Sequence, residues 1–575
     1  MLRKRDTQNR IRVVWIFFLL IALAIIVRLF ILQVIQHDYY ALFALNTHEI
    51  SKKLYPSRGA IYFQDSRTSE KYPAAVNREY YLIYASPREM LPRAVASTTQ
   101  RLVELLGVKD PQEQTELLAK LENHASGYVP LAKKVDKDVA DAVRAADITG
   151  VYITPRLYRY YPEERLGANI LGFVGSNEQG NLLGRYGLEG YWENKLAGHG
   201  GFLEGEQGAL GSWITLGQRT IKEPENGPEL VLTIDRTLEY KACERLRQGL
   251  EDYKAKSGVL VMMDPKTGAI RAMCSLPDFD PNNYSHVDDL NVYNNTSIFT
   301  PYEPGSVFKP ITMAAGLDLG LISPTTMYTD PCERIINGFH LRNAERKCYG
   351  QQSMTQVLEK SINTGVVWVQ EKMGNEQFKH YVSKFGFGVR TGITLNTEVS
   401  GDINSLSKKG QIFGANGSFG QGLTVTPLQL ATAYSAIAND GRLPKPYIVE
   451  QVQYENGKKE RTTPQTTEQV ISPRAAKLLS GMLVSVVENH YHAAKIPHYY
   501  VAGKTGTAQI PERGSYSLNR TNHTFAGFAP AANPRLVVVV KYEEPERRWA
   551  EQTALPVFRD VMKFALDYYG VPGDH

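Results

Sequence analysis

The sequence is poor in the features that nucleic-acid-binding and metal-binding proteins need. Outside the first twelve residues no long run of lysine and arginine occurs, and the net charge is only +5 over 575 residues, so binding to nucleic acid is not indicated. The four cysteines do not have the spacing of a metal site, and we expect no metal. The chain also has no internal repeat and no low-complexity tail, which excludes a repeat array.

Long apolar runs are scarce too, with one exception near the N-terminus. Val13–Ile35 is interrupted only by Arg28 and Gln33, and a strongly basic stretch precedes it. A helix of this length crosses a hydrocarbon core of ~30 Å, and the basic flank keeps the N-terminus in the cytoplasm. A cleaved signal peptide is the alternative, but the run is too long and no small-x-small cleavage site follows it. We therefore predict a cytoplasmic tail (1–12) and a transmembrane signal anchor (13–35), with the bulk of the chain extracytoplasmic.

Length and composition predict two domains after the anchor. The chain is 43% hydrophobic and 22% charged, which is ordinary for a globular protein with a sizeable core. The first part mixes short strands and helices, including a helical pattern over 95–123. The acidic stretch 223–229 then precedes a strand and Asp235, a candidate N-cap. We place the boundary here, giving domains at 36–228 and 229–575.

The second domain has strand patterns at both ends and helical patterns between them. Two apolar strands flank Asp264–Gly268, where Pro265 and Gly268 predict a tight hairpin. Helical patterns dominate from about 305 to 390, and apolar strands return after residue 520. One antiparallel sheet built from distant segments, an α+β layout, is expected.

The cysteines leave one question open. Cys274 lies in an apolar strand pattern and is expected to be a buried thiol. Cys332 and Cys348 bracket a polar stretch, where a disulfide would contribute about 3 kcal/mol. A disulfide and two free thiols are both compatible with this spacing.

Three short motifs carry candidate chemistry. Ser306 begins a helical pattern after Pro304-Gly305, and Lys309 lies three residues later on the same face. A serine hydroxyl becomes a nucleophile when a base takes its proton, and a desolvated neutral lysine can do so. Ser361 and Asn363 form a Ser-x-Asn turn between two helical segments. Lys504-Thr505-Gly506 follows an apolar strand, whereas the same tripeptide at Lys266–Gly268 lies in the predicted hairpin.

The ordered trio of Ser-x-x-Lys, Ser-x-Asn and Lys-Thr-Gly is the signature of penicillin-binding proteins and class A β-lactamases. The chain resembles the class B penicillin-binding proteins, the monofunctional transpeptidases of bacterial wall synthesis. Further stretches resemble the N-terminal signature, the pedestal and the region before the third motif of that family; they are 58–65, 159–175, 184–201 and 413–441. The resemblance implies a membrane-anchored protein with a mixed α/β pedestal (dimerisation-type) domain. It also implies a serine β-lactamase-like transpeptidase domain, an antiparallel sheet with a helical subdomain.

The resemblance also implies a role for each motif residue. Ser306 would attack the penultimate D-Ala carbonyl of a stem peptide, with Lys309 as the base. Ser361 would relay a proton to the departing D-Ala, and Asn363 would hold the substrate amide. The terminal carboxylate would bind Lys504, Thr505 and Thr507, while Gly506 would leave room along the strand edge. Backbone N–H groups of Ser306 and Thr507 would form the oxyanion hole. No cofactor is implied.

The implied function is a peptidoglycan D,D-transpeptidase of the bacterial cell membrane, acylated by β-lactams and acting on glycan strands derived from lipid II. The motif contexts resemble division enzymes more than elongation enzymes. The implied partners are a polytopic glycosyltransferase and other division proteins. An elongation-type transpeptidase, a D,D-carboxypeptidase or β-lactamase, and a non-catalytic division scaffold are the alternatives.

Overall fold

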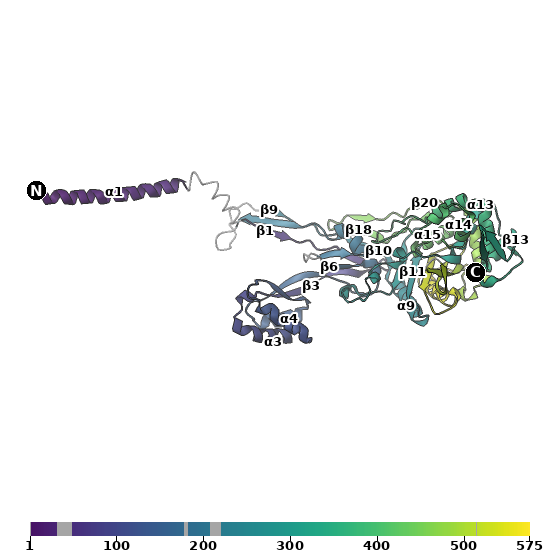
Figure 1. The fold of residues 1–575 in the computed structure, drawn as a ribbon, viewed down its shortest axis with the longest axis horizontal. Coiled ribbons are helices and arrows are strands. Elements are labelled where there is room, and N and C mark those ends of the chain that lie inside the picture. Colours follow the sequence, from purple (N-terminus) through teal and green to yellow (C-terminus); the bar gives the residue numbers. More distant parts are fainter. Residues whose placement is uncertain (1, 32–48, 177–181, 207–219, 513–514) are drawn as a thin grey trace. The chain divides into compact units, whose positions relative to one another are not determined.

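The computed structural model describes residues 2–31, 49–176, 182–206, 220–512 and 515–575. These fall into two compact units (Figure 1). The first unit comprises Met1–Ser57 with Gly198–Asn226, and the second comprises Arg58–Ala197 with Gly227–His575. Each unit is described by itself.

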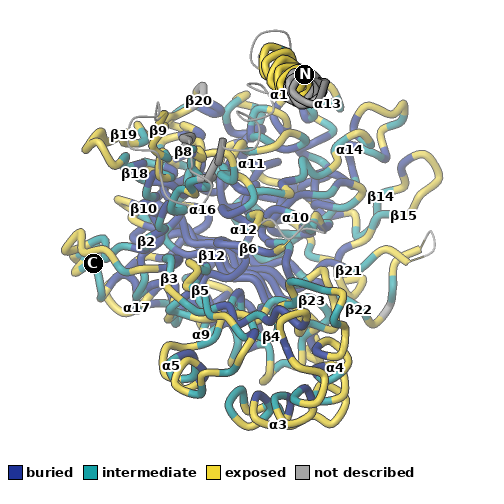
Figure 2. The backbone as a smooth tube through the Cα atoms, turned by 90° about the vertical axis from the view of Figure 1, so that its left-hand side faces the viewer, coloured by how far each residue is buried: buried dark blue, intermediate teal, exposed yellow. Residues whose placement is uncertain are grey.

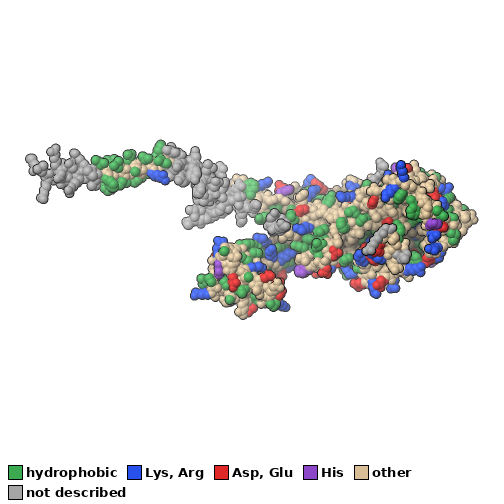
Figure 3. Space-filling model, in the orientation of Figure 1, with side chains coloured by type: hydrophobic (Ala, Val, Ile, Leu, Met, Phe, Trp, Pro, Cys, Tyr) green, Lys and Arg blue, Asp and Glu red, His purple; other side chains and the backbone are tan. Residues whose placement is uncertain are grey.

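The first unit contains one long helix and one small antiparallel sheet. Helix α1 (Leu2–Phe30) overlaps the predicted membrane anchor, of which residues 32–35 lie outside the described residues. From Trp15 to Phe30 its side chains are exposed and mostly hydrophobic (Figure 3). Within the described ranges, no helix combines the length and the apolar character of a membrane span. The sheet has the order β1 (Glu49–Leu54), β8 (Gly201–Glu206), β9 (Thr220–Lys222).

The second unit begins with a seven-stranded sheet in the order β19-β18-β10-β2-β3-β4, with β5 also paired to β3. β10 pairs parallel to β2 and antiparallel to β18, so one sheet joins segments more than 380 residues apart. The strands are β2 (Ile61–Gln64), β3 (Lys71–Ala85), β4 (Val129–Val135), β5 (Val151–Tyr160), β10 (Glu229–Asp235), β18 (Val449–Gln453) and β19 (Lys459–Arg461).

Three helices form a small hydrophobic core against β3: α3 (Val95–Leu106), α4 (Pro111–Glu122) and α5 (Lys137–Ala145). The predicted helix over 95–123 is therefore two helices. Gly107 adopts φ +67° at the end of α3, and Asp110 caps α4 with Pro111 in its first turn. A left-handed glycine and a proline at N1 are the ordinary end and start of two helices.

A buried glutamate ties together three stretches that are far apart in the sequence. Glu189 lies on the short helix α7 (Gly187–Tyr191) and its side chain is fully buried. Arg58, just before β2, donates from Nε to Glu189 Oε2 at 2.6 Å. Arg159, on β5, donates from Nε to Glu189 Oε1, also at 2.6 Å. Arg58 belongs to the stretch that resembles the family's N-terminal signature (58–65), and Arg159 and Glu189 belong to the two stretches that resemble its pedestal (159–175 and 184–201).

The predicted antiparallel sheet of the C-terminal part is present. It has five strands in the order β12-β11-β23-β22-β21, all antiparallel. Its strands are β11 (Ser257–Met263), β12 (Ile270–Leu276), β21 (Ala502–Glu512), β22 (Ser515–Ala529) and β23 (Leu536–Glu543). β11 and β12 form the predicted hairpin, with Gly268 at φ +85°. The motif strand β21 is an edge strand.

Helices cover this sheet and build the helical subdomain. Helices α9 and α17 contact each other and the sheet, as do α15 and α16, with α9 and α15 on either side of β11 (Figure 1). Buried residues concentrate along these strands, whereas exposed residues are frequent on α3 and α4 (Figure 2). The helices are α9 (Arg236–Asp252), α10 (Thr296–Phe299), α11 (Lys309–Asp318), α12 (Met354–Glu359), α13 (Asn363–Lys384), α14 (Gln411–Ser418), α15 (Pro427–Ala438), α16 (Pro473–Asn489) and α17 (Ala554–Tyr568).

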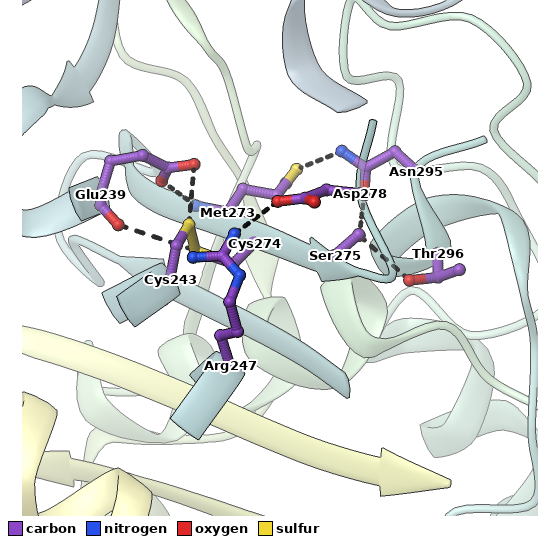
Figure 4. Close-up of a disulfide and its surroundings, with 9 residues drawn as sticks. All are labelled: Glu239, Cys243, Arg247, Met273, Cys274, Ser275, Asp278, Asn295 and Thr296. Carbon is purple, nitrogen blue, oxygen red and sulfur yellow. Dashed lines mark hydrogen bonds and ion pairs between the residues drawn. A yellow bond between two sulfur atoms is a disulfide. The ribbon is translucent and has the colours of Figure 1, made fainter. Parts of the chain in front are cut away.

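The four cysteines form two disulfides. Cys332 is bonded to Cys348, and the loop between them contains the hairpin β14 (Glu333–Ile336) and β15 (Phe339–Arg342). The expectation of a free thiol at Cys274 was wrong, because α9 packs on β12 and places Cys243 5.5 Å from it, Cα to Cα (Figure 4). Glu239 lies beside this disulfide, fully buried, and accepts a hydrogen bond from the Met273 N–H at 2.7 Å. Burial raises the pKa of Glu239 to about 7.

Candidate active site

The candidate nucleophile lies in a tight turn that leads directly into a buried helix. Ser306 is in a 3-10 turn, η6 (Gly305–Phe308), and α11 continues from Lys309. Gly305 adopts φ +61°, and a Cβ there would lie 2.9 Å from Ala508 Cβ on β21. Ser306 is half-buried, and its hydroxyl has no hydrogen-bond partner among the described residues. The turn therefore presents a free hydroxyl beside the motif strand.

Lys309 and Ser361 are in direct contact. The Lys309 side chain is fully buried, and Nζ donates to Ser361 Oγ at 3.0 Å and to the Ser361 carbonyl at 2.5 Å. Burial, followed by the nearby charge of Lys504, lowers the pKa of Lys309 well below its ordinary value. A buried lysine that favours its neutral form can accept a proton from a hydroxyl.

The Ser-x-Asn turn joins two helices, as predicted. Ser361 adopts φ +54° between α12 and α13, and Ser353 and Gln356 form the predicted capping box at the start of α12. Asn363 is the first residue of α13, and its Nδ2 donates to the Arg342 carbonyl on β15 at 2.9 Å. The disulfide-bounded hairpin therefore fixes the orientation of the Asn363 amide.

Lys504 is buried on the edge strand β21. Its Nζ donates to the Tyr491 hydroxyl at 2.9 Å and to the Thr505 carbonyl at 3.2 Å. Burial lowers the pKa of Lys504 to about 8, against the opposing attraction of Glu551. A Cβ on Gly506 would lie 2.8 Å from the Pro304 carbonyl. The glycine thus allows β21 to pack directly against the turn that carries Ser306.

Two residues at this site have no sequence signal that could have found them. The Tyr491 hydroxyl is 2.7 Å from Thr505 Oγ1, and Glu551 Oε1 is 3.2 Å from the same atom. Glu551 belongs to a short turn, η10 (Ala550–Gln552), whose Ala550 N–H donates to Thr507 Oγ1 at 3.1 Å. They are 14 and 46 residues from Thr505 in the sequence, and only the folding of β21 between α16 and α17 brings them together.

The second Lys-Thr-Gly copy lies away from these groups. Lys266 is at the β11–β12 hairpin, where its backbone N–H donates to Asp264 Oδ1 and its Nζ donates to Asn533 Oδ1. Among the described residues, one group of three side chains could offer metal ligands: Glu239, Cys243 and Cys274. Its two sulfur atoms are bonded to each other.

The assembled groups can perform acyl transfer. A free serine hydroxyl, a buried lysine that favours the neutral state, a serine bonded to that lysine and a second buried lysine on an adjacent edge strand are gathered around one turn. In such a reaction these groups could serve as a nucleophile, a base, a proton relay and a cationic group for an anionic substrate.

Comparison with known proteins places this arrangement in a family. The pattern described as "Penicillin binding protein transpeptidase domain" matches residues 258–563, and "Penicillin-binding Protein dimerisation domain" matches residues 53–232. Stage V sporulation protein D of Bacillus subtilis is 31% identical over 573 residues, covering 98% of this chain and 86% of that protein. The "Probable peptidoglycan D,D-transpeptidase PbpC" of Pseudomonas aeruginosa is 30% identical over 97% of this chain and 95% of its own. The structure of penicillin-binding protein 3 from Mycobacterium tuberculosis, complexed with aztreonam, superposes with a TM-score of 0.69 at 25% identity, covering 91% of this chain and 98% of that one.

Proposed function

Because this chain belongs to the penicillin-binding protein family, with a dimerisation domain followed by a transpeptidase domain, we propose that it is a peptidoglycan D,D-transpeptidase. Its substrate is a stem peptide ending in D-Ala-D-Ala on a glycan strand derived from lipid II. It joins this peptide to the amine of a second stem peptide and releases the terminal D-Ala.

Acylation begins at Ser306. Neutral Lys309 takes the proton from the Ser306 hydroxyl as Oγ attacks the penultimate D-Ala carbonyl. The backbone N–H groups of Ser306 and Thr507 stabilise the oxyanion, an interaction of about 3–4 kcal/mol for each donor. The close packing of Gly506 on the Ser306 turn supports this arrangement, because it brings the edge strand next to the nucleophile.

Proton transfer completes the step. The proton passes from Lys309 to Ser361, which is bonded to it at 3.0 Å, and then to the nitrogen of the departing D-Ala. Asn363 holds the substrate amide, and Lys504, Thr505 and Thr507 bind the terminal carboxylate. The amine of the second stem peptide then attacks the ester and restores the Ser306 hydroxyl, so no cofactor takes part.

The observation that carries this proposal is the buried contact between Lys309 and Ser361. A lysine without a carboxylate partner is costly to bury as a cation. A position with only a structural role would not require a buried lysine next to Ser361. The test is fluorescent penicillin labelling of the full chain in detergent, followed by mass spectrometry of the adduct. The label should map to the peptide containing Ser306, and it should be absent in Ser306→Ala. An unchanged adduct in Ser306→Ala would refute the acyl-enzyme.

A second assay separates transpeptidation from its hydrolytic alternative. Purified protein given a pentapeptide donor and an amine acceptor should yield a cross-linked dimer. Release of D-Ala without dimer, under conditions where a known transpeptidase works, would favour a D,D-carboxypeptidase.

The membrane anchor, the domain limits and the cellular role are further parts of the proposal. Residues 13–35 anchor the chain in the bacterial cell membrane with the N-terminus in the cytoplasm, 36–228 form the pedestal and 229–575 form the catalytic domain. The apolar run and its basic flank support the anchor, and the motif contexts around Ser306 and Thr424 support a septal role. The proposed docking surfaces for a polytopic glycosyltransferase and other division proteins are the membrane helix and the pedestal. The full chain should resist carbonate extraction from membranes. A fluorescent fusion should localise to the septum. Localisation along the lateral wall would instead favour the elongation role.

A further inference from the structure

The carboxylate-binding groups of the proposed function are already in contact with a carboxylate of the protein itself. Glu551 Oε1 lies 3.2 Å from Thr505 Oγ1, and its charge acts on Lys504. The neighbouring Ala550 N–H donates to Thr507 Oγ1. One short turn, η10, therefore forms hydrogen bonds with Thr505 and Thr507 and places a negative charge near Lys504, the three residues that would hold the terminal carboxylate of the substrate.

The hydroxyl proton of Thr505 is already directed at acceptors of the protein itself. A carboxylate only accepts and a lysine ammonium only donates. Lys504 Nζ therefore donates to the Tyr491 hydroxyl, and Thr505 Oγ1 donates to the Tyr491 oxygen at 2.7 Å and to Glu551 Oε1 at 3.2 Å. While the single Thr505 proton is directed at these two acceptors, Thr505 cannot donate it to a substrate.

The turn that carries Glu551 is fixed on both sides. Ala550 is bonded to Thr507, and Thr553 Oγ1 lies 2.9 Å from His523 Nδ1 on β22, the residue opposite Thr507 in the sheet. The Glu551 side chain itself is held less firmly. Its second oxygen, Oε2, is buried and has no hydrogen-bond partner among the described residues. A fixed backbone with a weakly bonded carboxylate allows the side chain to yield to a competing anion.

We propose that Glu551 is a specificity-determining residue whose carboxylate competes with the terminal carboxylate of the substrate for Thr505 and Lys504. This inference rests on the proposed function, since it assumes that Lys504, Thr505 and Thr507 bind that carboxylate. The substrate must displace Glu551 from Thr505 and bind beside a like charge. Glu551 therefore lowers the affinity for anionic donors in general and favours those with enough additional contacts to displace it.

The two histidines and the tyrosine beside this cluster favour their neutral forms. Burial lowers the pKa of His490 and lowers that of His523 to about 4, while burial raises the pKa of Tyr491. Glu359 accepts hydrogen bonds from Ser485 and Asn489. The groups that face the cluster from the surrounding elements are Lys309, Tyr349, Glu359, His490, Tyr491 and His523. Glu551 is thus the anion in hydrogen-bond contact with the carboxylate-binding groups.

The test compares a charged and an uncharged ligand of the same shape. Second-order acylation of Ser306 is measured by mass spectrometry on the full chain in detergent, with benzylpenicillin and with its methyl ester. Glu551→Gln keeps the acceptor for Thr505 and removes the charge. At pH 6.5 it should raise the rate with benzylpenicillin on the order of tenfold and leave the rate with the ester unchanged.

The pH dependence provides a readout that a structural role would not produce. Without Glu551 the cationic form of Lys504 loses its nearest anion, so Lys504 should lose its proton at a lower pH than in the wild type. The ratio of the acylation rate of Glu551→Gln to that of the wild type, measured with benzylpenicillin, should therefore decrease toward pH 9. Glu551→Ala should change the carboxylate-to-ester ratio in the same direction, which keeps the test open should the glutamine variant fold poorly.

The matched control is Glu546→Gln. Glu546 precedes the same turn, its side chain is 64% exposed, and it pairs with Lys254. Its replacement should leave both rates within twofold of the wild type. Equal changes for penicillin and ester in Glu551→Gln, or a fall with penicillin alone, would overturn the inference. A wild-type chain with no Ser306 adduct would overturn the proposed function first, and the inference with it.

Discussion

Lys309 and Lys504 are two buried lysines at one site, and the proposed mechanism requires them to hold opposite protonation states. Burial disfavours the charged form of both, and their mutual repulsion lowers the pKa of Lys309 further. Lys504 has Glu551 nearby to favour its charge, whereas Lys309 is bonded to Ser361 and has no carboxylate partner among the described residues. In the proposed mechanism the environment thus separates a base from a cation, so that one residue type serves two functions at one site.

This separation predicts a bell-shaped pH profile for acylation of Ser306 by benzylpenicillin. The rate should rise with pH as Lys309 loses its proton, because the base must be neutral. It should fall as Lys504 loses its proton, near pH 8, because the carboxylate requires a cation. Since the two lysines interact, the apparent pKa values of the two limbs belong to the pair and not to either lysine alone. Second-order acylation rates measured from pH 5.5 to 9.5 test the profile.

Lys504→Arg identifies the alkaline limb. Arginine stays charged throughout this range, so the fall near pH 8 should disappear even though the different shape of the guanidinium lowers the rate overall. An alkaline limb that persists unchanged in Lys504→Arg would assign it to another group.

At this scale the sequence predicted motif residues and missed their partners. Ser306, Lys309, Ser361 and Lys504 could be found because each belongs to a short motif in a suitable local context. Tyr491 and Glu551 belong to no motif, and their distance from Lys504 depends on how α16 and α17 pack around the sheet. The Cys243–Cys274 pair was missed for the same reason, because its sequence separation of 31 residues has no local signature.

Between elements, Glu189 joins three parts of the pedestal through a buried carboxylate. It links α7 to β5 and to the chain before β2, and the side chains of Arg58, Arg159 and Glu189 are 12%, 3% and 0% exposed. A buried ion pair adds little net stability, but removing one partner leaves an uncompensated buried charge.

Glu189→Gln should therefore destabilise the fold by about 3–5 kcal/mol, because Arg159 loses the carboxylate with which it pairs and Arg58 keeps only its pair with Glu193. Chemical denaturation followed by tryptophan fluorescence measures the loss. The control is Glu244→Gln on α9, where the pair with Lys241 is 50% and 42% exposed; it should cost less than about 1 kcal/mol. Equal effects of the two variants would mean that the Glu189 cluster is not a structural anchor.

At the scale of helices and strands, the sequence predicted the features that depend on local signals, such as turns, helix caps and strands. The proline and glycine of the β11–β12 hairpin, the Asp235 cap of α9 and the strands at both ends of the second domain are confirmed. The parallel pairing of β2 with β10 and the addition of β18 to that sheet could not be predicted. Such pairings are set by burial across long loops, which no local pattern encodes.

Across the whole molecule, the two disulfides bear on where the chain folds. Disulfides persist in oxidising compartments and are rare in the cytoplasm. Cys243–Cys274 joins a helix to the central sheet, and Cys332–Cys348 closes the loop that orients Asn363. Both disulfides lie C-terminal to the proposed anchor. The basic flank at the N-terminus and the cysteine pairs therefore give two independent arguments that the residues after 35 are extracytoplasmic.

This agreement can be measured by alkylating the cysteines of cells at the moment of lysis. If the chain after residue 35 is extracytoplasmic, alkylation of freshly lysed cells should find none of the four cysteines reactive before reduction and all four reactive afterwards. Purified protein should also lose stability on reduction, by about 3–4 kcal/mol for each opened loop in the chain-entropy account, and Cys243→Ala should reproduce the part due to the first disulfide without reductant. If all four cysteines react before reduction, the proposed topology is contradicted. Both pairs form disulfides in the folded structure, so only a reducing compartment would keep them as free thiols.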